Sequence, residues 1–232
     1  MLKQTWDTLF LPGEVAEVRV ILRDGGKAKH WQGWASGMVS GYFDNGEDMA
    51  LWVEPLDASG LAEGIYITLN PVDPSLLARA ANRLVGLKRN DATTTDDQIT
   101  VRRWVLVDID PVRPKGISST ADELKRAADR AKSVRSHLQE RGWPPPITAC
   151  SGNGIHLLYR VDMEAGPAST EATKAFLNNL ATQFSFSDSQ VDIDRAVFNL
   201  SRITKLYGTV ARKGDPTDDR PHRRSSLLDI PT

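Results

Sequence analysis

Two carboxylates separated by one residue follow an apolar run in the middle of the chain. The segment reads Trp104-Val105-Leu106-Val107-Asp108-Ile109-Asp110-Pro111, and its continuous apolar character predicts a buried strand. Side chains alternate along a strand, so Asp108 and Asp110 would project from one face and Ile109 from the other. Like charges at that spacing repel each other unless a cation compensates them, and carboxylate oxygens suit Mg²⁺ or Mn²⁺. Taken alone, the pair fits equally well a strand that ends in solvated acids before a proline turn.

A second candidate is the turn Ser151-Gly152-Asn153-Gly154, which leads into Ile155 and His156. Glycines let a backbone approach a ligand closely and present N–H groups to phosphate oxygens. The Ser151 hydroxyl and the His156 ring would add two side-chain donors to such a site. The structural alternative is a hairpin turn followed by a histidine on a polar strand face.

Further acids and cations gather toward the C-terminal end. Val191-Asp192-Ile193-Asp194 precedes a series of basic residues, namely Arg202, Lys205, Arg212 and Lys213. Carboxylates that hold metal ions, beside cations that neutralise phosphate charge, are the combination that nucleotidyl transfer requires. Salt bridges among the same groups at a surface are the structural alternative.

Composition and charge are those of an ordinary globular protein. The 232 residues are 40% hydrophobic and 25% charged, enough for one large or two small domains with a buried core. The net charge of −1 excludes a protein-wide positive field for nucleic acid, and the basic residues gather locally between Arg212 and Arg224. The single cysteine, Cys150, excludes an intramolecular disulfide and a cysteine-based zinc site. No signal peptide or membrane-length apolar stretch is present, so we expect a cytoplasmic protein without membrane contact.

The order of the predicted elements gives the fold class. Residues 1–98 are expected to form a β-rich N-terminal module, with strands at 15–22, 50–53 and 64–69 and one helix from Asp73-Pro74 to residue 84. Residues 99–232 follow the order strand, helix, hairpin, helix, strand, which is the split βαβ or RRM-like plan. Their predicted elements lie at 101–110, 120–142, 147–161, 169–184 and 191–194.

We therefore expect an α+β protein in which an RRM-like half with a basic C-terminal tail packs against an N-terminal α/β module. The active-site groove would lie between these two parts. In an RRM-like sheet the first strand is central, so Asp108 and Asp110 would lie at the middle of the sheet.

Taken together and in this order, the three motifs resemble those of the archaeo-eukaryotic primase superfamily, in particular its primase-polymerase branch from phages, plasmids and CRISPR-associated loci. The resemblance covers roughly residues 60 to 224. It implies that Asp108 and Asp110 are the two metal-binding acids of the first motif. The segment from Ser151 to His156 resembles the second motif, which contacts the phosphates of the incoming nucleotide. Residues 194–209 resemble the third motif, which contributes a third metal-binding acid with basic residues nearby.

The resemblance implies a DNA-directed primase-polymerase, a template-directed nucleotidyltransferase that makes primers, extends them, or both. Two Mg²⁺ or Mn²⁺ ions, and no zinc, would be its cofactors. NTPs or dNTPs would be its substrates, with a single-stranded DNA template and a primer. A helicase, or other replication or CRISPR proteins, would be partners if the chain is part of a longer one. The implied setting is the cytoplasm of a prokaryote, with a phage or plasmid as the source.

Each candidate residue then has an implied role. Asp108, Asp110 and Asp194 would bind the metal ions and carry the catalysis. Ser151, Gly152, Asn153, Gly154 and His156 would seat the nucleotide phosphates. Arg202 and Lys205 would neutralise the β- and γ-phosphates, and Arg212 and Lys213 would follow nucleotide or template phosphates.

The third acid has two candidates. The family places this acid five residues before an asparagine, which selects Asp194 because the asparagine is Asn199. Strand alternation would put Asp192 on the same face, so Asp192 stays open as an additional ligand. The chain also departs from family members with a zinc-binding insertion, which one cysteine cannot build.

Two other functions deserve comparison. A non-catalytic RRM-like nucleic-acid-binding module would need aromatic residues on its sheet face, whereas the strand 101–110 carries Val105 and Val107 and ends in acids. A replication-initiator endonuclease with a tyrosine nucleophile would need two closely spaced histidines. All four histidines are isolated in the sequence: His30, His137, His156 and His222.

Overall fold

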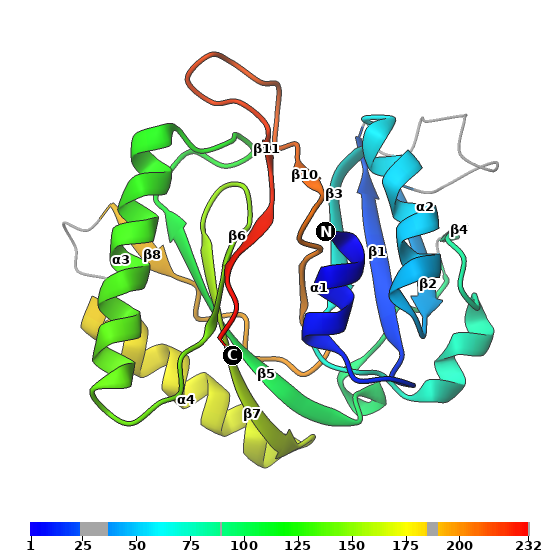
Figure 1. The fold of residues 1–232 in the computed structure, drawn as a ribbon, viewed down its shortest axis with the longest axis horizontal. Helices are drawn as coiled ribbons and strands as arrows, with labels where there is room; N and C mark the ends of the chain where they lie inside the picture. Colours follow the sequence, from blue (N-terminus) through cyan, green and yellow to red (C-terminus); the bar gives the residue numbers. More distant parts are fainter. Residues whose placement is uncertain (24–36, 89, 185–189, 232) are drawn as a thin grey trace.

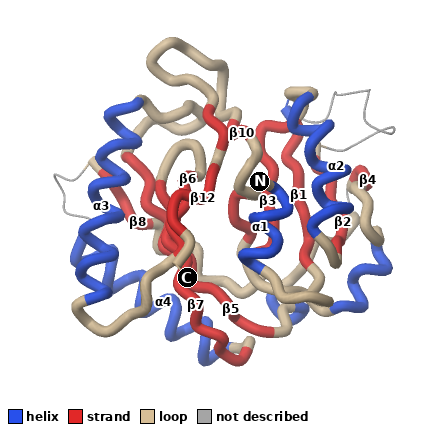
Figure 2. The backbone as a smooth tube through the Cα atoms, viewed as in Figure 1, coloured by secondary structure: helices blue, strands red, loops and turns tan. Residues whose placement is uncertain are grey.

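Two five-stranded sheets lie side by side in the protein (Figure 1). The computed structural model describes residues 1–23, 37–88, 90–184 and 190–231. Within these ranges, neighbouring strands of both sheets run antiparallel. Figure 2 shows helix α3 at one side of the molecule and helix α2 at the other, with strands and loops between them. The α+β class predicted from the sequence is confirmed.

The first sheet is formed mainly by the N-terminal part of the chain. Its strand order is β4-β2-β1-β3-β9, and helix α2 packs on β2 and β3 while helix α1 packs on α2. Apolar side chains from both helices enter the core beneath them, among them Trp6, Leu9 and Met49. The elements are α1 (Leu2–Leu9), β1 (Ala16–Leu22), β2 (Met38–Phe43), α2 (Gly46–Ala58), β3 (Ala62–Thr68), β4 (Val85–Gly86) and β9 (Ile203–Lys205).

The prediction of a strand at residues 50–53 is wrong, because these residues lie in α2. The Asn45 side chain starts the helix by accepting a hydrogen bond from the Asp48 N–H at 2.8 Å. Met49, Val53 and Leu56 then recur at helical spacing and are fully buried. Four residues are too few to show a helical period, so the longer window from Asn45 was needed.

The helix predicted for residues 74–84 is shorter than expected. Asp73 caps it as predicted, accepting from the Ser75 N–H at 2.8 Å, but the segment is the 3₁₀ helix η2 (Pro74–Arg79). Beyond it the backbone pairs with Tyr42 of β2: the Tyr42 N–H donates to the Ala80 carbonyl, and the Asn82 N–H donates to the Tyr42 carbonyl. These sheet contacts draw residues 80–82 out of a helical path, a long-range effect that local spacing does not reveal.

The second sheet has the predicted split βαβ arrangement. Its order is β12-β6-β7-β5-β8, so β7 lies between β5 and β6, and β8 flanks the other side of β5. Helices α3 and α4 pack against β5, β7 and β8, and Thr120 and Glu123 form the predicted capping box of α3. Helix α4 begins at Pro167, two residues before the predicted start. The elements are β5 (Val101–Pro111), α3 (Ala121–Gln139), β6 (Ile147–Cys150), β7 (Ile155–Glu164), α4 (Pro167–Phe184), β8 (Val191–Ile193) and β12 (Ser226–Asp229).

A short strand late in the chain joins the two sheets. After β8 the chain crosses over, and β9 pairs with β3 of the first sheet, with Lys205 opposite Tyr66 and Thr204 opposite Ile67. The division of the chain between residues 98 and 99 stays a prediction. Strand β9 lies in the second part of the sequence, but it pairs with a strand of the first part. The helices within the described ranges all lack the combination of length and apolarity that spanning a bilayer requires.

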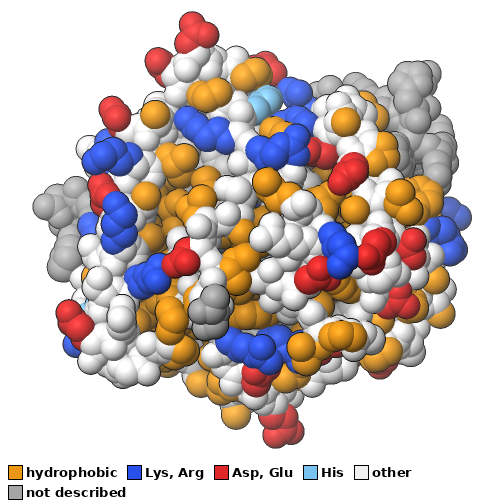
Figure 3. All heavy atoms as spheres, in the orientation of Figure 1, with side chains coloured by type: hydrophobic (Ala, Val, Ile, Leu, Met, Phe, Trp, Pro, Cys, Tyr) orange, Lys and Arg blue, Asp and Glu red, His pale blue; other side chains and the backbone are white. Residues whose placement is uncertain are grey.

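The basic tail is tied down by ion pairs within the protein. Asp57 is 3% exposed, and its carboxylate lies 2.8 Å from Arg212 Nη1 and 3.0 Å from Arg224 Nη1. Arg220 donates to both carboxylate oxygens of Glu123, at 2.8 and 2.9 Å. Between Arg212 and Arg220 the chain forms an exposed loop, and two-residue strands close it, β10 (Val210–Ala211) and β11 (Arg223–Arg224). On the face shown in Figure 3, basic and acidic side chains alternate rather than form one continuous basic patch.

We predict that Asp57→Ala destabilises the fold by about 3–5 kcal/mol, because the change leaves Arg212 buried without its carboxylate. Urea unfolding monitored by circular dichroism measures the difference. Asp129→Ala is the matched control, since the Asp129 pairs with Lys125 and Lys132 are exposed on α3 and their loss should leave stability unchanged. Equal stability of Asp57→Ala and wild type would contradict this account of the tail.

Candidate active site

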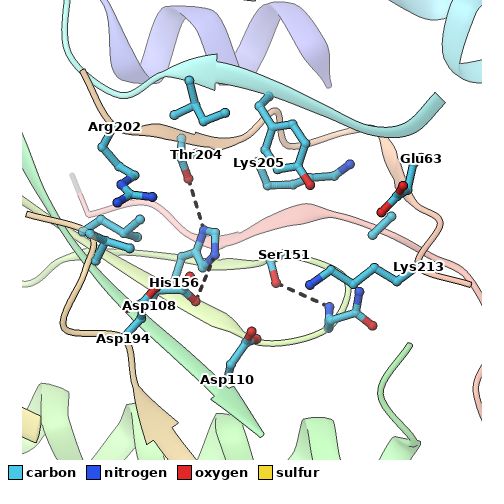
Figure 4. A pocket seen from close by; sticks show the side chains of 16 residues that line it. Glu63, Asp108, Asp110, Ser151, His156, Asp194, Arg202, Thr204, Lys205 and Lys213 are labelled. Carbon is cyan, nitrogen blue, oxygen red and sulfur yellow. Dashed lines mark hydrogen bonds and ion pairs between the residues drawn. The ribbon is translucent and has the colours of Figure 1, made fainter. Parts of the chain in front are cut away.

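A cavity of about 270 Å³ lies between the two sheets and collects most of the candidate residues (Figure 4). The second sheet supplies its carboxylates and the Ser151 turn, and the first sheet supplies β3 and β9. The groove expected between the two parts is therefore present. Nine predicted residues line it: Asp108, Asp110, Ser151, Asn153, His156, Asp194, Arg202, Lys205 and Lys213.

Asp108 and Asp110 lie on β5, an interior strand of the second sheet. As predicted, they point to the cavity, whereas Ile109 between them is fully buried on the opposite face. The register places Asp108 opposite His156 of β7 and Asp110 opposite Asp192 of β8. An interior strand fixes both carboxylates from two sides, so their separation is set by the backbone.

The pKa values of the two carboxylates are shifted in opposite directions. Burial acts to raise the pKa of Asp108, but the neighbouring His156, together with Lys213 and Arg202, outweighs burial and holds that pKa below its ordinary value. Burial and the negative charge of Asp108 raise the pKa of Asp110 to about 6, against the opposing charges of Arg113 and Lys213. The pair therefore carries negative charge that the surrounding cations only partly compensate.

The Ser151 turn packs directly against the end of β5. Gly152 has φ +99°, and a Cβ on Gly154 would lie 2.1 Å from Asp110 Oδ1 and 2.6 Å from the Ile109 carbonyl oxygen. Glycine at position 154 is thus what lets the turn approach the carboxylate. The N–H of Gly154 donates to Ser151 Oγ at 3.0 Å and that of Gly152 to Cys150 Sγ at 3.3 Å. Donation by the turn to phosphate oxygens stays a prediction.

His156 sits between Asp108 and the first sheet. Its Nε2 lies 3.3 Å from Asp108 Oδ1, and its Nδ1 lies 2.8 Å from the Tyr207 hydroxyl and 3.3 Å from Thr204 Oγ1. Thr204 and Tyr207 fall within the third motif, but no local pattern predicts that their hydroxyl groups reach His156, about fifty residues earlier. The pairing of β9 with β3 creates this contact.

Of the four predicted cations, three line the cavity and Arg212 does not. Arg202 Nε donates to Asn199 Oδ1 at 2.9 Å, which fixes the guanidinium at the wall of the cavity. Lys205 is 4% exposed, donates to the Val210 carbonyl at 3.0 Å and lies 5.5 Å from the centre of the Tyr66 ring. Lys213 faces Asp110, whereas the Arg212 guanidinium is bound to Asp57.

The two candidates for the third acid lie in different places. Asp194 lines the main cavity, and its N–H donates to the Asp108 carbonyl at 2.9 Å. Asp192 is exposed and lines a neighbouring cavity of about 480 Å³, which also contacts Asp110 and Lys213. Asp194 Oδ1 accepts a hydrogen bond from the Ala196 N–H at 2.7 Å. The geometry favours Asp194 as the acid nearer to Asp108 and His156.

The carboxylate pair fits a divalent cation. Asp108 Oδ1 is buried and, among the residues that the structure describes, makes no well-aligned hydrogen bond, although His156 Nε2 lies 3.3 Å away; Asp110 is held close to a like charge. Oxygen atoms of this kind are ligands that Mg²⁺ and Mn²⁺ prefer. Across the described ranges, no group of three or more His, Cys, Asp or Glu side chains stands ready to hold a metal ion. The fit therefore concerns Asp108 and Asp110.

Glu63 and Tyr66 of β3 also line the cavity, and sequence reasoning missed both. The predicted strand at 64–69 includes Tyr66 but begins after Glu63, whereas β3 begins at Ala62; its position across from β5 also depends on how the two sheets pack. Glu63 is exposed and Tyr66 is half-buried beside Lys205. They form the wall opposite the carboxylates.

Three solved structures similar to this chain come from primases or primase-polymerases. No protein-family model and no curated protein sequence matches the chain. It is similar to the AEP domain PP-N190 of the cyanophage S-2L primase-polymerase, at 16% identity and a TM-score of 0.49, over 98% of this chain and 88% of that one. The catalytic domain of primase RepB' in complex with initiator DNA gives 14% identity and a TM-score of 0.48, over 98% and 84%. Primase RepB' gives 16% and 0.47, over 98% and 56%.

Lys205 leads to a prediction about pH and stability. Burial lowers the pKa of Lys205 from 10.5 to about 7. The negative charge of Asp57 acts to raise this pKa, and the positive charges of Arg212, Arg224 and Lys213 lower it further. Between pH 7 and pH 10.5 the Lys205 side chain is protonated in the unfolded chain but not in the folded chain, so stability rises with pH. Relative to Lys205→Met, the wild type should gain about 3 kcal/mol between pH 7 and roughly pH 9.5. Urea unfolding at both pH values measures this, and a pH-independent difference would contradict it.

Proposed function

We propose that the protein is a template-directed nucleotidyltransferase of the primase-polymerase kind, which synthesises or extends primers on single-stranded DNA. One observation carries the proposal: two half-buried carboxylates from an interior strand face a cavity whose other walls carry His156, Arg202, Lys205 and Lys213. Nucleotidyl transfer requires carboxylates that bind the metal ions and basic side chains that neutralise the phosphates.

Asp108 and Asp110 would hold Mg²⁺ or Mn²⁺, with Asp194 as the third acid. When bound there, the two ions would supply activation of the primer 3′-hydroxyl and coordination of the nucleotide triphosphate. The residues contribute a fixed spacing, because β5 lies between β7 and β8 and cannot shift its end without breaking both ladders. Burial and the negative charge of Asp108 raise the pKa of Asp110. A bound cation would lower that pKa again, so Asp110 would then be fully ionised.

The cations around the cavity would bind the triphosphate. Arg202 is held by Asn199, so its remaining N–H groups are oriented before a ligand arrives. Lys205 has a pKa near neutrality, and a phosphate beside it would favour its charged form. Lys213, like Asp110, lines both cavities, so it would bind phosphates of the nucleotide or the template in either one. For Arg212 we propose a structural role instead, since Asp57 binds its guanidinium.

A non-catalytic RRM-like module gains no support from the site. The carboxylates of Asp108 and Asp110 on the interior strand repel a phosphate backbone, and Tyr66 is the one Phe, Tyr or Trp among the described residues that line the cavity. A cytoplasmic location, a phage or plasmid source, and partners such as a helicase or CRISPR proteins stay predictions of the sequence resemblance.

The proposal predicts the effects of four isosteric changes. Asp108→Asn and Asp110→Asn should each lower template-directed incorporation of labelled NTPs or dNTPs in Mg²⁺ or Mn²⁺ by at least about 100-fold, because each removes a cation ligand. Asp194→Asn should also lower it strongly. Asp192→Asn is the matched control and should stay within about threefold of wild type, since Asp192 faces the neighbouring cavity.

Circular dichroism spectra of all four variants should match wild type. Incorporation that survives in Asp108→Asn and Asp110→Asn, or that is lost in Asp192→Asn but kept in Asp194→Asn, would contradict the assignment. Wild-type protein that incorporates no nucleotide on primed or unprimed templates would contradict the proposed function itself.

A further inference from the structure

Two buried hydroxyl groups contact the ring of His156 on the side away from Asp108. The Tyr207 hydroxyl lies 2.8 Å from His156 Nδ1, Thr204 Oγ1 lies 3.3 Å from the same nitrogen, and the two hydroxyls lie 3.3 Å from each other. All three side chains are at most 5% exposed. Figure 4 shows Thr204 and Asp108 on opposite sides of the His156 ring. The Tyr207 ring also packs edge-to-face on the imidazole, with centroids 5.8 Å apart.

The hydrogen-bonding chemistry of these groups selects one tautomer. His156 Nε2 lies 3.3 Å from Asp108 Oδ1, and an ionised carboxylate can only accept hydrogen bonds. A lone pair on Nε2 would repel that oxygen, so Nε2 must carry the hydrogen. In a neutral imidazole Nδ1 is then the acceptor, and it requires a donor because it is buried. The nearer hydroxyl, that of Tyr207, is placed to donate to it.

The hydroxyl groups come from the opposite sheet. His156 is on β7 of the second sheet, whereas Thr204 is on β9, paired with Ile67 of the first sheet. The Tyr207 backbone is held by α1, because Thr5 Oγ1 donates to the Tyr207 carbonyl at 2.9 Å. The orientation of His156 is therefore set by the packing of the two sheets against each other.

We propose that Tyr207 and Thr204 are positioning residues for His156. Their hydroxyl groups hold the imidazole in the Nε2–H tautomer, with Nε2 directed at Asp108 and the cavity, where its single N–H would be shared between Asp108 Oδ1 and a phosphate oxygen of the bound nucleotide. The contact with phosphate rests on the proposed function, whereas the tautomer does not depend on it.

Kinetics of Tyr207→Phe test the positioning role, because this change removes the hydroxyl and keeps the ring. We expect the KM for the incoming nucleotide to rise about five- to tenfold with kcat changed less than about threefold. Tyr159→Phe is the matched control: Tyr159 is also buried on β7, and its hydroxyl has no hydrogen-bond partner within the described ranges. It should leave the KM unchanged. Thr204→Ser should behave like wild type, and Thr204→Val should raise the KM.

The same change in a second background separates positioning from general damage. In a His156→Ala protein, Tyr207→Phe should have no further effect on the KM, because the residue through which it acts is absent. An undiminished effect there, or an equal effect of Tyr159→Phe, would overturn the proposal. If Tyr207→Phe does not fold, Thr204→Val with its Thr204→Ser partner makes the same test.

A spectroscopic measurement tests the tautomer without catalysis. In ¹⁵N spectra of the histidine rings at about pH 8.5, the His156 signals, assigned by their loss in His156→Ala, should show a protonated Nε2 in wild type and a mixture of tautomers in Tyr207→Phe. A wild-type ring protonated on Nδ1 would overturn the proposal. Wild type that shows the Nε2–H tautomer but incorporates no nucleotide would refute the proposed function and leave the positioning of the ring established.

Discussion

Asp108 and Asp110 repel each other across one face of β5, and pairing of that strand with β7 and β8 holds their backbone positions close together. Because both side chains are half-buried, this repulsion is stronger than in water. The structure offsets it incompletely. His156 stands beside Asp108, Arg113 Nη2 lies 3.7 Å from Asp110 Oδ2, and Lys213 faces both acids. The residual negative charge gives the cavity its affinity for cations in our account.

The other side of the cavity depends on a crossing of the chain between the two sheets. After β8 the chain leaves the second sheet, and β9 pairs with β3 of the first sheet, which brings Thr204 and Lys205 over the carboxylates. The tail that follows is locked to both halves, by Asp57 on α2 and by Glu123 on α3. Arginine residues that appear in the sequence as a phosphate-binding patch are thus largely occupied in holding the halves together. The site is a product of the interface between the sheets.

Local signals in the sequence were sufficient for strands β5 to β8 of the second sheet and for the placement of Asp108 and Asp110 on β5, but β12 was not predicted. The apolar run before Asp108, the capping box at Thr120 and the glycine turn after Ser151 each specify an element over a few residues, and all three are present. Local signals failed where long-range pairing decides the outcome. Residues 80–82 pair with Tyr42 instead of continuing a helix, and the Arg212 side chain meets Asp57, far away in sequence. Glu63, Tyr66 and Tyr207 join the site only through the packing of one sheet against the other.

Thermal unfolding of wild type and Asp110→Asn at pH 8, with and without Mn²⁺, tests the central claim most directly. Without a divalent cation, Asp110→Asn should be the more stable protein, since the change removes the repulsion from Asp108 and keeps the shape of the side chain. Added Mn²⁺ should raise the unfolding temperature of the wild type and leave that of Asp110→Asn nearly unchanged, because only the intact pair binds the ion. A wild type that is the more stable protein without Mn²⁺, or an equal response of both proteins to Mn²⁺, would contradict the account.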